Sequence, residues 1–187
     1  MSLLTTASQT VGPYLKIGFD SLTFDTIASK KTPGEHFVLK GRMFDGDGKP
    51  INDGSIEIWQ ANANGKYASP EDTQKKALVA GFRGYGRVLT DPAGAFRFST
   101  IKPGRVPGPG RALQAPHLEV VIFMRGSLRH LLTRMYFPGD PANAGDPVLK
   151  LVPAERRATL IARAVKPGVL EWDVHMQGPK ETVFFDF

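Results

Sequence analysis

The chain has 187 residues, 41% of them hydrophobic, which is enough for one domain with a sizeable core. Its formal net charge is +6, but the basic residues are scattered and form no tract, which argues against nucleic-acid binding. The longest apolar stretches are strand-sized, far short of the roughly 20 residues that cross a bilayer. The composition therefore favours a small anionic ligand, which needs only one or two arginines.

The cysteine content and the first residues of the chain bear on its compartment. There is no cysteine, so disulfides and thiolate metal sites are excluded. Residues 1–11 are polar, with no basic region followed by an apolar run, and they predict no signal peptide. We therefore expect a cytoplasmic protein, because reducing compartments do not sustain disulfides.

Short runs of alternating apolar and polar residues, separated by many glycines (20) and prolines (15), predict strands joined by turns. In chain order the predicted strands are residues 37–44, 55–61, 87–90, 95–101, 117–124, 130–137, 170–177 and 181–187. Residues 102–116, rich in proline and glycine, predict an irregular loop, and 154–157 a helical turn. The segment 159–165 is ambiguous between helix and strand. About nine short strands in one domain, residues 1–187, predict an all-β sandwich or barrel with little helix.

Two of the predicted strands have informative faces. Between residues 55 and 61, Ile56 and Ile58 share one face, and Glu57 and Trp59 share the other. The strand 117–124 ends in a nearly continuous apolar run, which is typical of a buried central strand.

His117 and Glu119 stand two residues apart on that strand, so both side chains project from the same face. An imidazole and a carboxylate suit a non-haem iron or zinc site, but two ligands are too few for one. The other histidines, His36, His130 and His175, lie on other predicted strands and do not complete a set. The alternative, which the spacing alone favours, is a hydrogen-bonded His117 with Glu119 in solvent or paired with an arginine.

Two tyrosines, Tyr67 and Tyr14, come directly after residues that restrict or turn the backbone. Tyr67 comes just after the end of a predicted strand and an Asn-Gly turn. There are three alternatives for it: a phenolate ligand, a hydrogen-bonding group or, more commonly, a ring packed on the edge of the core. Tyr14 ends the string Gly12-Pro13-Tyr14, in which proline fixes φ. This string predicts either a stiff, extended arm over a pocket or an ordered terminus packed on the sheet.

Several longer strings of the sequence together resemble the intradiol ring-cleavage dioxygenases, and in particular the alpha chains of that family that bind no iron. The resemblance runs from Ser8 to Phe187 and rests on residues 8–14, 33–36, 57–67, 100–104, 134–137 and 181–187. It implies the family's single-domain β-sandwich with long loops. It also implies an N-terminal arm, residues 1–35, that contacts a beta chain.

The same resemblance implies a dismantled metal site. Catalytic chains of the family hold Fe(III) with two tyrosines and two histidines, and hard phenolate oxygens suit that ion. Laid on this sequence, the tyrosine positions fall at Tyr67 and Val106, and the histidine positions at His117 and Glu119. An arginine that stands near the substrate in catalytic chains falls at Gln114. The resemblance therefore implies no metal and no catalytic residue in this chain, with Fe(III) in the partner beta chain.

What remains for this chain, by resemblance, is part of the wall of the beta chain's substrate cavity. Thr10, Gly12, Pro13 and Tyr14 would line that cavity, and Arg125 would face the carboxylate of 3,4-dihydroxybenzoate. A guanidinium is the natural partner of a benzoate carboxylate. Without the resemblance, Arg125 is more simply a solvated arginine in a turn.

The implied function is that of the alpha subunit in an αβ enzyme assembled into a higher oligomer. With O2, that enzyme cleaves 3,4-dihydroxybenzoate between its hydroxyls to 3-carboxy-cis,cis-muconate, in the beta-ketoadipate pathway of aromatic catabolism. The chain alone would be inactive. Two alternatives stay open: a stand-alone enzyme with a metal on Tyr67, His117 and Glu119, and a stand-alone, non-catalytic module that binds aromatic acids.

Overall fold

The computed structural model describes residues 4–110 and 112–186. The first three residues of the predicted arm, Arg111 in the predicted loop and Phe187 at the end of the last predicted strand lie outside this part. The strands are β1 His36–Phe44, β2 Ser55–Trp59, β3 Tyr85–Leu89, β4 Ala95–Ile101, β5 His117–Phe123, β6 Leu131–Tyr136, β7 Arg163–Lys166, β8 Val169–Glu171 and β9 Val174–His175. The helix α1 spans Pro13–Phe19, and four 3-10 helices are η1 Asp20–Leu22, η2 Pro141–Gly145, η3 Leu149–Leu151 and η4 Ala154–Leu160.

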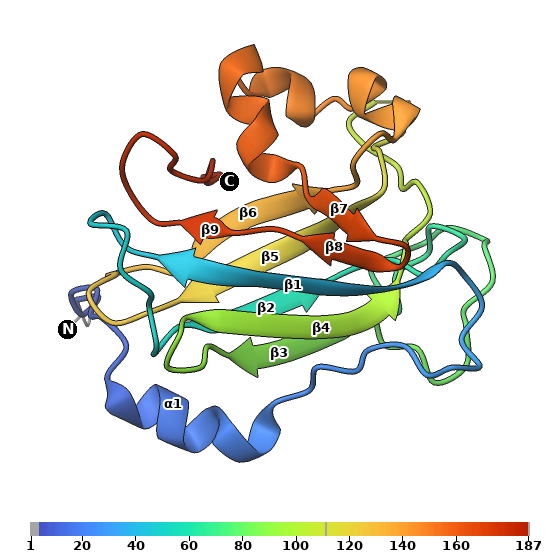
Figure 1. Ribbon diagram of the computed structural model, residues 1–187. Helices are drawn as coiled ribbons and strands as arrows, with labels where there is room; N and C mark the ends of the chain where they lie inside the picture. The colour runs from blue at the N-terminus through green and yellow to red at the C-terminus, as the bar shows by residue number, and fades with distance from the viewer. Residues whose placement is uncertain (1–3, 111, 187) are drawn as a thin grey trace.

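The strands form two sheets that pack face to face (Figure 1). One sheet has the order β4-β1-β8-β7, with β9 paired to β1, and the other has the order β3-β2-β5-β6. This arrangement confirms the prediction of an all-β sandwich. The predicted central position of the strand at 117–124 is also confirmed, because β5 lies between β2 and β6.

The core fills the space between the sheets and follows from the alternation within each strand. Leu39 of β1, Phe98 of β4 and Leu118 of β5 are completely buried there. Ile56 and Ile58 point into the same core, whereas Trp59 keeps 36% of its surface exposed, as the alternation predicts. Each such buried side chain contributes about 1.5–3 kcal/mol to stability.

The end of the chain departs from the predicted strands. The single strand expected at 170–177 is two short ones, β8 and β9, because Asp173 between them accepts a hydrogen bond from the backbone of Arg42. The strand expected at 181–187 is wrong for the residues described. Its backbone makes one isolated bridge, from Phe185 to Leu132, and the Thr182 hydroxyl takes the place of a ladder partner by accepting from the amide of His175.

Two predictions before this region concerned helical structure, at 154–157 and at 159–165. The turn predicted at 154–157 is the first part of η4. The ambiguous segment 159–165 divides between the end of η4 and the start of β7, so each of the two interpretations holds for part of it.

Of the two alternatives predicted for the N-terminal segment, the stiff, extended arm is wrong, because residues 13–19 form the helix α1 and Tyr14 belongs to that helix. The structure supports the other alternative, an ordered terminus packed on the sheet. Pro13 occupies a first-turn position, where its missing N–H is not needed and its fixed φ suits the helix. A helix this short is not stable alone and depends on tertiary contacts. Among the described residues, no helix has the length and apolar character that a membrane span requires.

The sheet supplies these contacts along one side of α1 (Figure 1). Lys16 Nζ donates to the carbonyl of Asn52 at 2.6 Å and lies 3.4 Å from that of Thr90. The Phe19 ring lies under the guanidinium of Arg87, with 3.9 Å between the Arg87 Cζ and the ring centroid. The helix is therefore fixed through its middle and its C-terminal end to β3 and to the loops that contain Asn52 and Thr90.

Candidate functional site

The two residues predicted as a partial metal site, His117 and Glu119, lie on β5, on the face of the sheet β3-β2-β5-β6 that points away from the core between the sheets. The strand register places Trp59 opposite Glu119, and Glu119 opposite Arg134, so these three side chains form one row across the sheet. His117 stands in the next row, opposite Tyr136. The expectation that His117 and Glu119 share a face is confirmed.

The imidazole of His117 is buried and oriented by the backbone. Its Nδ1 lies 2.8 Å from the carbonyl oxygen of Ala115, and since a carbonyl only accepts, Nδ1 carries the hydrogen. Its Nε2 lies 3.3 Å from Glu119 Oε1 but has no well-formed hydrogen bond within the described part of the chain. An Nδ1–H bound to a backbone carbonyl with Nε2 left free is the usual second-shell arrangement of a metal-binding histidine.

Glu119 is paired with an arginine, which was the alternative that the H-x-E spacing favoured. Arg134 Nη2 donates to Glu119 Oε1 at 2.6 Å. Burial alone would raise the pKa of Glu119, but the contacts with His117 and the Arg134 guanidinium outweigh burial and hold that pKa below its usual value. Glu119 is therefore an ionised carboxylate whose negative charge is neutralised by Arg134.

Gln114, at the position of the family's arginine, contacts the same guanidinium. Its Oε1 accepts from Arg134 Nη1 at 2.6 Å, and its Nε2 donates to the carbonyl of Pro107 at 2.7 Å. Where the resemblance implies an arginine, the loop at 102–116 carries the amide of Gln114, and a cation from β6 contacts that amide.

Arg134, Tyr136 and Asp146 are members of the site that the sequence did not reveal. Arg134 Nη1 lies 3.4 Å from the Tyr136 hydroxyl, which donates to Asp146 Oδ1 at 3.1 Å. Asp146 is completely buried and also accepts from the amide of Ala115 at 2.7 Å. The one available signal was a charged residue in the middle of an otherwise apolar predicted strand, at 134.

Tyr67 closes the outer side of the site. Its ring stacks on Trp59, with centroids 6.1 Å apart and planes 12° apart, and both line a pocket of about 410 Å³ together with Val106 and Gln114. Burial, and next the charge of Glu119, raise the pKa of the Tyr67 phenol. The structure thus brings together Tyr67, Val106 and Gln114 around this pocket.

These residues do not fit the four-ligand ferric site of the family's catalytic chains. Val106 is a buried hydrocarbon and offers no donor atom. Glu119 is engaged by Arg134, so Tyr67 and His117 are the two remaining donors, which are too few to hold Fe(III). Within residues 4–110 and 112–186, no group of three or more His, Cys, Asp or Glu side chains could hold a metal ion.

The residues predicted to serve a partner lie elsewhere, at the turn between β5 and β6. The guanidinium of Arg125 pairs with the carboxylate of Asp53, and the Arg125 side chain stays 59% exposed. The next amide, Gly126 N–H, donates to the Thr10 hydroxyl at 2.7 Å. Thr10 and Arg125 therefore lie side by side, while Tyr14 is 82% exposed on α1.

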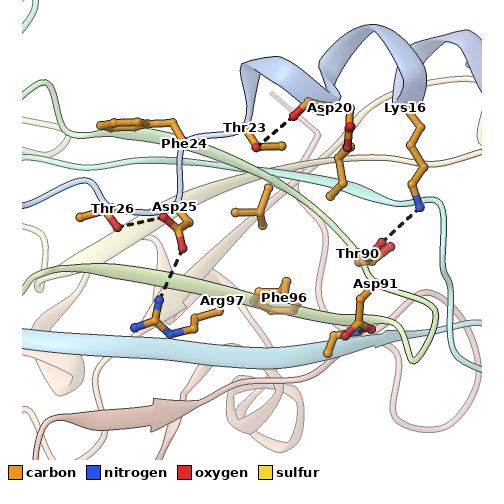
Figure 2. Close-up of a pocket in the computed structure, with 13 residues that line it drawn as sticks. Lys16, Asp20, Thr23, Phe24, Asp25, Thr26, Thr90, Asp91, Phe96 and Arg97 are labelled. Carbon is orange, nitrogen blue, oxygen red and sulfur yellow. Dashed lines mark hydrogen bonds and ion pairs between the residues drawn. The ribbon is translucent and has the colours of Figure 1, made fainter.

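A further pocket, of about 620 Å³, lies between α1 and the strands β3 and β4 (Figure 2). Three of its charged side chains contact other parts of the protein: Asp25 pairs with Arg97 at 3.4 Å, and Lys16 binds backbone carbonyls. Figure 2 shows these groups along the rim of the pocket, where they connect the N-terminal segment to the sheet. These contacts therefore anchor the N-terminal segment to the sheet.

Comparison with known proteins gives concordant matches. The model of a family described as "Dioxygenase" matches residues 18–181. The protocatechuate 3,4-dioxygenase alpha chain of Burkholderia cepacia is 46% identical over 99% of this chain and 98% of its own length. The beta chain of the same enzyme in that organism is 39% identical over 76% of this chain and 61% of its own length. Among solved structures, a dioxygenase domain from Streptomyces sp. SirexAA-E superimposes with a TM-score of 0.62 at 25% identity, over 86% of this chain and 89% of that one.

Proposed function

The chain belongs to the intradiol dioxygenases, and from this we propose that it is the alpha subunit of a protocatechuate 3,4-dioxygenase. The observation that carries this proposal is a match to an alpha chain along nearly the whole of both sequences, together with a donor set that no longer suits iron. Paired with a beta chain, the protein takes part in the cleavage of 3,4-dihydroxybenzoate between its hydroxyls with O2, giving 3-carboxy-cis,cis-muconate.

The division of labour within the proposed complex follows from the two sets of residues. Fe(III) is held by the beta chain and supplies the redox chemistry of ring cleavage there. This chain contributes binding and orientation through the arm, residues 1–35, and through Arg125, whose guanidinium matches a benzoate carboxylate in charge and geometry. Thr10, Gly12, Pro13 and Tyr14 line the cavity between the chains.

The setting of the enzyme is part of the same proposal. The αβ units assemble into a higher oligomer in the cytoplasm and act in the beta-ketoadipate pathway of aromatic catabolism. The absence of cysteine supports this location, because the protein then makes no use of an oxidising compartment.

The two stand-alone alternatives require features that are weaker in this chain. An enzyme using Tyr67, His117 and Glu119 would need Glu119 free, yet its carboxylate oxygen lies 2.6 Å from Arg134 Nη2. A binding module without a partner would leave Tyr14 and Ile17, which are 82% and 68% exposed, uncovered on α1.

Co-expression with a beta chain that retains two tyrosine and two histidine ligands tests the proposal. We expect the two chains to co-purify, and the pair to consume O2 with 3,4-dihydroxybenzoate and to form the muconate. The full chain alone should show no turnover under the same conditions. Turnover by the chain alone would instead establish the stand-alone enzyme, and failure of the two chains to associate would support the isolated binding module.

A further inference from the structure

One feature of the site has no counterpart in the ligand set of the family, namely a cation supplied by the chain itself. The Arg134 side chain is only 9% exposed, and its guanidinium lies at 2.6 Å from both Glu119 Oε1 and Gln114 Oε1. By the resemblance, Glu119 stands at the position of an iron ligand and Gln114 at the position of the arginine near the substrate. Both residues are bound here to one guanidinium.

This contact resolves an electrostatic problem. A carboxylate in a partly buried place is costly unless a cation neutralises it and hydrogen bonds satisfy it. In a metal site the ion does this, whereas here the Arg134 guanidinium neutralises Glu119. His117 Nε2, which is buried without a well-formed hydrogen bond in the described residues, still faces the same carboxylate oxygen at 3.3 Å.

The guanidinium is also held in place from more than one side. The Gln114 amide that accepts from it is fixed in turn by its own bond to the carbonyl of Pro107. The Tyr136 hydroxyl lies 3.4 Å from Nη1 and is itself bound to the buried Asp146. The cation therefore cannot leave the site without breaking several contacts at once.

We propose that Arg134 is an internal counter-cation that takes the electrostatic place of a metal ion and keeps metal ions out of this chain. An ion bound between His117 Nε2 and Glu119 Oε1 would have to displace the guanidinium or lie beside its positive charge. Removing that charge therefore frees His117 Nε2 and Glu119 Oε1 for a divalent ion that takes its other ligands from water. This inference concerns the chain itself and does not depend on the beta chain.

The test compares Co²⁺ binding by the full wild-type chain and by the Arg134→Gln chain, with Co²⁺ alone as the probe. Binding heat and the visible absorption of Co²⁺ give affinity, stoichiometry and ligand type. We expect at least tenfold tighter binding by Arg134→Gln, at about one ion per chain, and loss of this gain when His117→Ala is added. Arg134→Lys, which keeps the positive charge, is the matched control and should behave as the wild type does.

Arg134→Gln leaves Glu119 unpaired, so a second pair of variants covers the case in which it does not fold. Glu119→His and Glu119→His with Arg134→Gln both lack the carboxylate, and circular dichroism verifies their fold. We expect the double variant to bind Co²⁺ at least tenfold more tightly than the single one. Equal affinities within either folded pair would overturn the proposal, and so would Co²⁺ binding by the wild-type chain that His117→Ala removes.

Discussion

The guanidinium of Arg125 forms an ion pair with the carboxylate of Asp53, which lies in the loop before β2. Asp53 has a side chain only 20% exposed, so it is the fixed member of the pair, while Arg125 is 59% exposed and presents its remaining donors outward. Beside it, the amide of Gly126 binds Thr10. The turn after β5 is thus connected both to the neighbouring strand and to the N-terminal arm, which places an oriented cation beside the residues proposed to line the cavity.

Replacing Arg125 with alanine should weaken the binding of 3,4-dihydroxybenzoate by the αβ enzyme. A charge-assisted hydrogen bond contributes roughly 1.5–3 kcal/mol, which corresponds to a rise in KM of about 10- to 150-fold. Arg125→Lys should recover part of this loss, because it keeps the charge but not the planar fork. Steady-state kinetics measure this effect. If the KM of Arg125→Ala equals that of the wild type, Arg125 does not bind the substrate.

Asp53→Asn should have a smaller effect of the same kind, since Asp53 orients Arg125 and does not itself meet the substrate. An exposed ion pair contributes up to about 1 kcal/mol, so we expect KM to change by less than tenfold with kcat nearly unchanged. Asp47→Asn, which removes the exposed contact with Lys49, is the matched control and should leave both constants as they are. A fall in kcat alone for Asp53→Asn would contradict the positioning role.

The Phe19→Ala variant should loosen α1. The Phe19 ring lies 3.9 Å from the Arg87 guanidinium, which is itself fixed by Glu57 at 2.7 Å, and a contact of this kind contributes about 0.5–2 kcal/mol. We expect faster amide hydrogen exchange in residues 13–19 and weaker association with the beta chain. Ile17→Ala is a control for exchange, because Ile17 is 68% exposed. Unchanged exchange in Phe19→Ala would show that the anchor lies elsewhere.

The strands of the sandwich were predictable because alternation and turn residues are local signals. The runs around Leu39, Ile56, Phe98 and Leu118 gave their positions to within a few residues. The helix α1 was missed because a seven-residue segment with Gly18 inside has no periodicity to read, and it forms through contacts distant in sequence. The last predicted strand failed for a related reason. The backbone of Val183 bonds to the side chains of Thr133 and Thr159, and the amides of Thr182 and Phe185 donate to carbonyls of two different strands, β9 and β6.

The candidate site likewise has a part that could be predicted from the sequence and a part that could not. That His117 and Glu119 share a face follows from the two-residue period of a strand, so this part was available from the sequence. The pairing of Glu119 with Arg134 depends on the register between β5 and β6, to which no local pattern gives access. The resemblance predicted the positions at which the family's ligands are replaced, but it did not identify the cation that binds Glu119 and Gln114.

Gly104 of the loop at 102–116 should not tolerate a side chain. A Cβ at this position would lie 2.4 Å from the carbonyl oxygen of Ala63 and 2.5 Å from the amide nitrogen of Gly65, so the two loops beside the site would have to separate. We expect Gly104→Ala to lower the free energy of unfolding by about 1–3 kcal/mol. Gly18→Ala is the opposite control: it has nothing within 4 Å, and we expect a gain of about 0.5–1 kcal/mol in the helix. Urea unfolding measures both, and equal stability of Gly104→Ala and wild type would contradict this packing.

Asp72 should make the stability of the loop that carries Tyr67 dependent on pH. Burial opposes its ionisation, but hydrogen bonds from the backbone of Tyr67 and Gln74, and contacts with Lys66, outweigh burial and lower the pKa of Asp72 from 3.8 to about 2. Because the folded pKa lies below the unfolded one, the stabilisation is complete above about pH 4 and is lost as the pH falls toward 2.

The Asp72→Asn variant isolates this contribution. At pH 7 it should be less stable than the wild type by roughly 1–2 kcal/mol, because it loses hydrogen bonds to a charged acceptor. At pH 2, close to the folded pKa, Asp72 is protonated in the unfolded wild type and about half protonated in the folded one, so the difference should shrink to a small fraction of that value. Urea unfolding at pH 7, 4 and 2 measures it, and Asp45→Asn on an exposed turn serves as a control for general acid effects. A difference that is the same at all three pH values would mean that Asp72 stabilises the loop through shape and not through its charge.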